Sequence, residues 1–143
     1  MRLLLDTHVC LWVVIGSPRI TAAARSVVES AEQTFVSAAS IWEIGIKARL
    51  GKIEADTDGL VASIGQSGFM ELPVRTVDVA AAARLPLHHS DPFGRLLVAQ
   101  AITEPFAAVD CRRGVGALQR AGGSRVAPCR AEAQRLQAFT LKT

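Results

Sequence analysis

The sequence predicts a three-layer α/β/α sandwich with a central parallel sheet. The chain has 143 residues, 50% of them apolar, which suits one compact core. Short apolar runs alternate with longer helical segments, and such alternation implies parallel strands joined by right-handed crossovers, with helices on both faces of the sheet. We expect this domain to span residues 1–105 and to be followed by an atypical basic tail, residues 106–143.

Short apolar runs bounded by turn signals predict the strands, which we place at residues 2–5, 34–37 and 69–72. The intervening segments have helical length and end at glycine or proline. We place helices at residues 9–15, 21–30, 38–50, 58–65, 76–83 and 91–103.

Capping residues set the helix boundaries. Thr21 and Ser37 can accept hydrogen bonds from the first free backbone N–H groups of the helices that follow them. Gly51 suits the left-handed conformation that ends many helices. Asp91 followed by Pro92 favours a helix start, because proline has no N–H to leave unpaired there.

The net charge of +3 lies in the tail. Residues 1–105 hold nine Lys and Arg against eleven Asp and Glu, whereas residues 106–143 hold seven against two. The basic balance is therefore no argument that the folded part binds nucleic acid. The cysteines Cys10, Cys111 and Cys129 are odd in number and lack metal-ligand spacing, so we expect neither a disulfide framework nor a zinc site.

The sequence favours a cytoplasmic protein without a membrane span. No run approaches the roughly 18 apolar residues that a span requires. The first apolar run reaches Asp6 too early for the apolar region of a signal peptide.

Three acidic residues are candidates for chemistry, and each has a structural alternative. Asp6 ends the first strand, where ligands bind in parallel sheets, but it can also cap the next helix. Glu43 lies among apolar residues, yet an exposed ion pair with Lys47, worth about 0.2–0.5 kcal/mol, would explain it. Asp91 can act as a helix cap alone.

Three sequence motifs around these acids indicate that they share one role. "LLLDTH", "SAASIWEIGIKARLGKI" and "LPLHHSDPFGRLLVAQA" resemble the PIN-domain ribonucleases, in particular the VapC-type toxins of bacterial toxin-antitoxin pairs. The resemblance covers residues 1 to about 105. It implies an acidic cluster at the sheet edge to which Asp6, Glu43 and Asp91 contribute catalytic, metal-binding carboxylates. It also implies an RNA substrate, a cognate antitoxin protein that keeps the toxin silent, and a homodimer.

A cluster of carboxylates needs a cation. Two carboxylates about 4 Å apart repel by roughly 4 kcal/mol at an effective dielectric of 20, so they must be neutralised or take up protons. Mg²⁺ or Mn²⁺ is the natural partner, because these hard ions take oxygen ligands and bridge to phosphate.

One departure from the family pattern leads us to expect that the ribonuclease activity of this chain is impaired. Related toxins commonly read Asp-Pro-x-Asp near residue 91, and the second Asp falls on Gly94 here. Asp91 lies one helical turn earlier. A catalytically inactive PIN domain that only binds antitoxin and dimerises is therefore a second interpretation. A phosphatase with a strand-end Asp nucleophile ranks third, because it would carry an acid where His8 stands.

The tail departs further from the pattern. Residues 106–143 contain six Arg and no Ile, and lack the Thr-x-Asp expected after a fourth strand. Reading the codons of Phe106 to Val115 one nucleotide later permits Leu-Arg-Leu-Leu-Thr-Ala-Asp-Ala-Ala-Leu. We therefore expect a shifted reading frame, a missing or altered C-terminal strand, poor order beyond about residue 110, and no catalytic role for Asp110.

Overall fold

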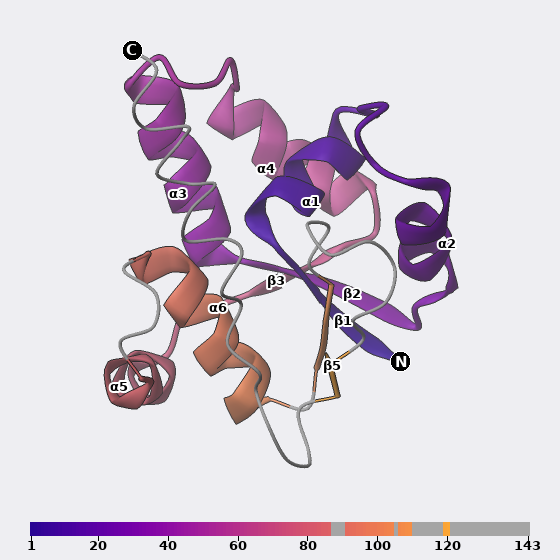
Figure 1. Cartoon of the computed structure of the whole chain (residues 1–143). Coiled ribbons are helices and arrows are strands. Elements are labelled where there is room, and N and C mark those ends of the chain that lie inside the picture. Colours follow the sequence, from indigo (N-terminus) through magenta and orange to yellow (C-terminus); the bar gives the residue numbers. More distant parts are fainter. Residues whose placement is uncertain (87–90, 105, 110–118, 121–143) are drawn as a thin grey trace.

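A computed structural model of the chain describes residues 1–86, 91–104, 106–109 and 119–120. Its sheet has five strands in the order β3-β2-β1-β4-β5 (Figure 1). The strands are β1 Arg2–Leu5, β2 Gln33–Ser37, β3 Met70–Leu72, β4 Ala107–Val109 and β5 Gln119–Arg120. The first four pair in parallel, and β5 pairs antiparallel to β4.

Within the described residues, six helices connect and cover these strands. They are α1 Thr7–Val14, α2 Ala22–Ser30, α3 Ala38–Arg49, α4 Thr57–Gln66, α5 Thr76–Arg84 and α6 Pro92–Thr103. Helices α1, α2 and α4 lie on one side of the sheet, and α5 and α6 on the other (Figure 1). The predicted α/β/α fold class is confirmed, and the helix ends fall within two residues of those expected.

Alternation along β1 builds two cores. Leu3 and Leu5 point to the layer of α1, α2 and α4, whereas Leu4 points to the other side and packs with Phe35. Cys10 is fully buried in the first core. Burial, with a smaller contribution from the charge of Asp6, raises the pKa of its thiol to about 12. Cys10 is therefore an apolar packing residue.

A short fourth strand is present at residues 107–109, so of the two expectations, a missing or an altered C-terminal strand, the first is wrong for these residues. Strand β4 pairs with β1 from Leu3 to Leu5. Phe106, just before it, is 2% exposed, and its ring lies 4.8 Å from that of Phe35. Alanine at residues 107 and 108 is compatible with a strand inside the sheet. The sequence analysis did not predict this strand, because it judged residues 106–143 by their overall basic composition. The expectation for the tail beyond about residue 110 falls largely outside the described residues.

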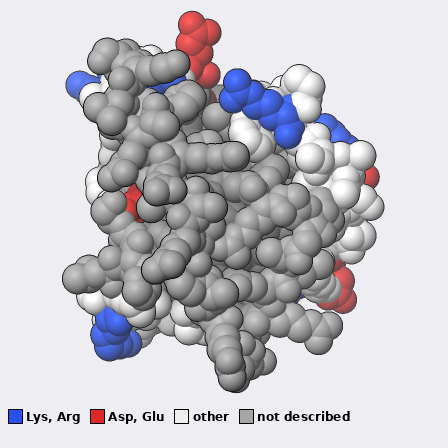
Figure 2. All heavy atoms as spheres, in the orientation of Figure 1, with Lys and Arg blue, Asp and Glu red and all other residues white. Residues whose placement is uncertain are grey.

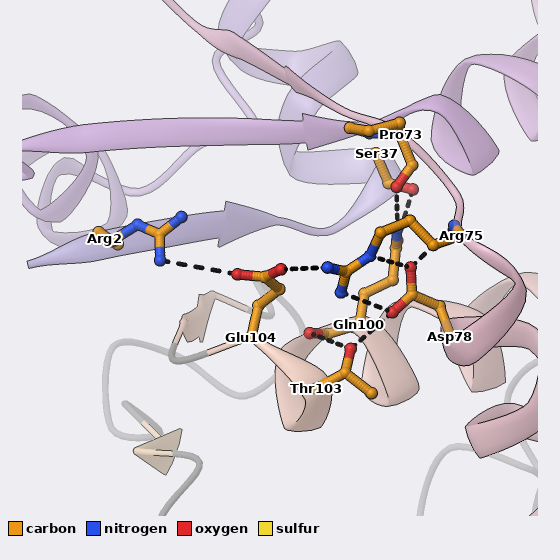
Figure 3. A network of polar contacts seen from close by, with 8 residues as sticks. All are labelled: Arg2, Ser37, Pro73, Arg75, Asp78, Gln100, Thr103 and Glu104. Carbon is orange, nitrogen blue, oxygen red and sulfur yellow. Dashed lines mark hydrogen bonds and ion pairs between the residues drawn. The ribbon is translucent and has the colours of Figure 1, made fainter.

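A polar network joins α5 and α6 to β1 (Figure 3). The Arg75 guanidinium lies 3.1 Å from Asp78 and 2.7 Å from Glu104, and Glu104 lies 3.8 Å from Arg2. The Thr103 hydroxyl donates to Asp78 at 2.6 Å. Burial alone would raise the pKa of Asp78, but the hydrogen bonds from Arg75 and Thr103 and the charge of Arg75 outweigh it and lower the pKa to about 2.

A second chain of hydrogen bonds continues this network toward the carboxyl edge of the sheet (Figure 3). The Ser37 hydroxyl donates to Gln100 Oε1 at 2.6 Å, and Gln100 Nε2 donates to the carbonyl of Pro73 at 3.1 Å. Ser37 Oγ also accepts from the Ala39 N–H and so caps α3, as predicted. These bonds fix the start of α3 relative to α6.

Candidate active site

Asp6 lies at the carboxyl end of β1, immediately before α1. Its Oδ1 accepts a hydrogen bond from the His8 N–H at 2.7 Å, and His8 Nδ1 lies 3.5 Å from the same oxygen. The predicted cap is therefore confirmed. The cap does not exclude a second role, because the side chain is 24% exposed at the edge where parallel sheets bind ligands.

Glu43 lies on α3, which begins where β2 ends. The expectation of an exposed side chain is wrong, because only 10% of it is accessible. The expected ion pair is present, with Lys47 Nζ 2.6 Å from Oε1. The Thr7 hydroxyl donates to Oε2 at 2.7 Å, so both carboxylate oxygens have a partner. Glu43 lies on the inward face of α3 together with the buried residues Ala39, Ser40 and Ile44.

Thr7 is a residue that the sequence analysis passed over. It is buried, and its hydroxyl also lies 3.1 Å from Ser40 Oγ. Because a hydroxyl has one proton and Thr7 gives it to Glu43, Ser40 is left to donate to Thr7. The only feature of the sequence that could have indicated Thr7 is its position directly after Asp6, the acid at the end of the first strand. Thr7 therefore ties the residue after Asp6 directly to Glu43.

Asp91 caps α6 with both carboxylate oxygens, which accept from the N–H groups of Phe93 at 3.2 Å and Gly94 at 3.0 Å. The aromatic rings of Phe93 and Trp42 meet edge to face, with centroids 5.4 Å apart. Because Trp42 precedes Glu43 on α3, this contact places the start of α6 beside the start of α3. The three acids thus come from neighbouring elements.

The donor atoms fit a hard divalent ion, but their arrangement is incomplete. Carboxylate oxygens are the ligands that Mg²⁺ and Mn²⁺ prefer. Among the residues described, however, no three His, Cys, Asp or Glu side chains lie close enough together to hold a metal ion. In addition, Asp91 is engaged as a cap and Glu43 is paired with Lys47.

A cavity of about 360 Å³ lies at the opposite edge of the sheet. It is lined by Gln33 and Thr34 at the amino end of β2 and by Ser67 to Phe69 before β3. None of the three candidate acids lines it. The candidate acidic residues and this cavity therefore lie in different parts of the molecule.

In Figure 2, the described Lys and Arg side chains that are visible stand in separate places, with described acidic side chains between them. This agrees with the slight acidic excess of residues 1–105. Over the described part of the chain, no helix has both the length and the apolar character needed to cross a bilayer.

The fold is an α/β/α sandwich with Asp6 at the carboxyl end of strand β1 in a mainly parallel sheet. The family model of the PIN domain matches residues 3–111, so the chain belongs to the PIN-domain family. PIN domains are typically nucleases and generally use divalent metal ions. The match extends through β4. No curated protein matches the chain.

Proposed function

We propose that the protein is a metal-dependent endoribonuclease of the VapC toxin type, with Asp6, Glu43 and Asp91 as its acidic residues. The observation that carries the proposal is the 2.7 Å hydrogen bond from Thr7 to Glu43. It joins the end of β1 to α3, so that Asp6 and Glu43 belong to one site at the edge where α/β folds bind ligands. The three family motifs supply the reaction class.

The acidic residues and Thr7 each have a distinct role in this proposal. A bound Mg²⁺ or Mn²⁺ would supply Lewis acidity and an activated water for phosphodiester hydrolysis. The Asp6 cap holds its carboxylate at the strand end, and Thr7 orients Glu43 by hydrogen bonding to Oε2. Asp91 adds negative charge from the start of α6, which lowers the cost of concentrating cations there.

The proposed partners are a cognate antitoxin protein and a second copy of the chain. Trp42 is 66% exposed and forms an aromatic surface with Phe93 next to the acidic site. Val98 and Ile102 extend exposed apolar side chains from α6. Aromatic side chains are enriched in protein interfaces, which supports a protein partner on this side.

A specific observation favours the second candidate function, a catalytically inactive PIN domain that binds antitoxin. Position 94 is glycine where the related toxins carry an acid. In addition, Glu43 is paired with Lys47 in the structure. Fewer free carboxylate oxygens mean weaker metal binding.

The proposed ribonuclease activity is tested by incubating the protein with a mixed RNA pool in the presence of Mg²⁺ or Mn²⁺, and in parallel with EDTA, which removes the metal ion. Asp6→Asn retains a helix-capping side chain and removes the charge. Glu43→Gln removes the charge within α3 and keeps the size of the side chain. Glu54→Gln, an exposed carboxylate between α3 and α4, is the matched control. We expect weak metal-dependent cleavage, because Gly94 replaces an acidic ligand, and we expect the first two variants to lose it and the control to keep it.

Two results would contradict the nuclease proposal. One is cleavage that EDTA does not affect, and the other is cleavage that Asp6→Asn leaves intact. A chain that cleaves nothing but co-purifies with its genomic neighbour would support the inactive antitoxin-binding domain instead.

A further inference from the structure

We propose that Lys47 is a built-in counter-ion of the acidic site, which occupies Glu43 in the absence of metal and must be displaced when a divalent ion binds. The inference rests on the proposed metal-dependent function. It concerns how the site is loaded, and it assigns a regulatory role to a side chain outside the acidic set.

The first support is direct competition for one oxygen atom. Lys47 Nζ lies 2.6 Å from Glu43 Oε1, while Thr7 occupies Oε2 at 2.7 Å. A divalent ion that takes Glu43 as a ligand needs one of these oxygens. Thr7 is uncharged, and ligating carboxylates commonly keep such a hydrogen bond. Lys47 is a cation, so it and a metal ion repel each other at the same carboxylate.

The second support is the difference in exposure between the two partners. The Glu43 side chain is 10% exposed, whereas that of Lys47 is 30% exposed. The carboxylate is held inside the site, and the ammonium group reaches it from the solvent side. A lysine ammonium on a flexible stem can return to water, where it is strongly hydrated. Lys47 can therefore leave without rearranging α3.

The third support is that Glu43 has its counter-charge in the structure without a metal ion. A carboxylate buried like Glu43 needs a counter-charge, and Lys47 provides it at the i+4 position of the same helix. Lys47 thus stabilises the metal-free site and raises the concentration of ion required to load it.

Titration of the full chain with Mn²⁺, followed by the electron paramagnetic resonance signal of free Mn²⁺, tests this role directly. Lys47→Met removes the charge and keeps an apolar stem, and we expect it to bind Mn²⁺ about tenfold more tightly than wild type, since ion affinity depends on the net charge of the ligand set. Lys47→Arg keeps the charge and should bind like wild type. Lys52→Met removes an exposed lysine three residues beyond α3 and is the matched control.

The outcomes separate this inference from the proposed function. Equal or weaker Mn²⁺ binding by Lys47→Met overturns the role of Lys47, and Mn²⁺ binding that Asp6→Asn removes would still support the metal site. Binding by Lys47→Met where wild type shows none supports the inference most strongly. No binding by any variant overturns both. Lys47→Gln, which keeps a hydrogen-bond donor without the charge, replaces Lys47→Met if circular dichroism shows that the latter is unfolded, with the same expectation.

Discussion

Thr7 shows how one buried hydroxyl holds an acidic side chain in position. Thr7→Val has nearly the same shape but cannot donate to Glu43, which leaves a buried carboxylate oxygen without its hydrogen bond. We expect a loss of roughly 1–3 kcal/mol in the free energy of unfolding, measured by urea denaturation. Thr7→Ser keeps the hydroxyl and should lose less. Equal stability of the valine variant and wild type would show that the bond contributes nothing.

Gly94 is the second informative single residue. A Cβ at this position would meet Asp91 Oδ2 at 2.8 Å, so the capping carboxylate must shift for any larger residue to fit. Because that atom ends a flexible side chain, the shift is small. We expect Gly94→Asp to raise Mn²⁺ affinity on the order of tenfold, since it adds a negative oxygen ligand beside Asp91. Calorimetric titration measures the change, and Gly94→Asn, which adds no charge, is the control. An equal gain in both variants would contradict the ligand interpretation.

At the scale of elements, Asp91 combines a structural and a proposed metal-binding role, and two variants separate them. Asp91→Ala removes the cap of α6 and should destabilise the fold by roughly 0.5–2 kcal/mol. Asp91→Asn keeps a good cap, so we expect nearly wild-type stability together with weaker Mn²⁺ binding. Thermal unfolding and Mn²⁺ titration of both variants measure the two effects. If Asp91→Asn binds Mn²⁺ like wild type, Asp91 is only a cap.

The helices could be placed from sequence because their ends are local. Thr21, Ser37 and Asp91 each accept hydrogen bonds from N–H groups two or three residues ahead. Such bonds depend on neighbours in the chain and leave a readable pattern. Strand β4 was not recognised, because its partner β1 lies about a hundred residues away and its own three residues have no distinctive pattern.

At the scale of the whole molecule, the network around Asp78 links stability to pH. The pKa of Asp78 is lowered from 3.8 to about 2 in the folded chain. A carboxyl group with a depressed folded pKa stabilises the fold above its unfolded pKa, and this contribution disappears as the pH falls through the folded value. We expect wild type to exceed Asp78→Asn in stability by roughly 1–3 kcal/mol near neutral pH, with the difference shrinking between about pH 4 and pH 2.

Urea midpoints of both proteins over that range measure this difference. Asp58→Asn removes an exposed carboxylate on α4 and should follow wild type throughout. A difference between wild type and Asp78→Asn that stays constant down to about pH 2 would show that the charge of Asp78 is not what stabilises the network.

The shifted-frame hypothesis for the tail stays a prediction. Because residues 106–109 fit the sheet, it need only account for the residues that follow them. Phe106 and β4 fit the sheet as they are encoded. Determining the nucleotide sequence of codons 106–115 tests the hypothesis. We expect the frame one nucleotide later to encode an apolar run followed by Thr-x-Asp, and a stop codon or the absence of that pattern there would eliminate it.

The sequence by itself determined the α/β/α class, the six helices and the three candidate acids, because these follow from periodicity, capping residues and short motifs that each occupy a few neighbouring positions. Only the tertiary structure decided that Glu43 is buried between Thr7 and Lys47, that Asp91 uses both oxygens as a cap, and that Phe106 belongs to the core. The physical reason is distance along the chain. Burial and charge pairing depend on segments that meet only after the sheet has formed, and no local pattern records which side chain will reach a given carboxylate.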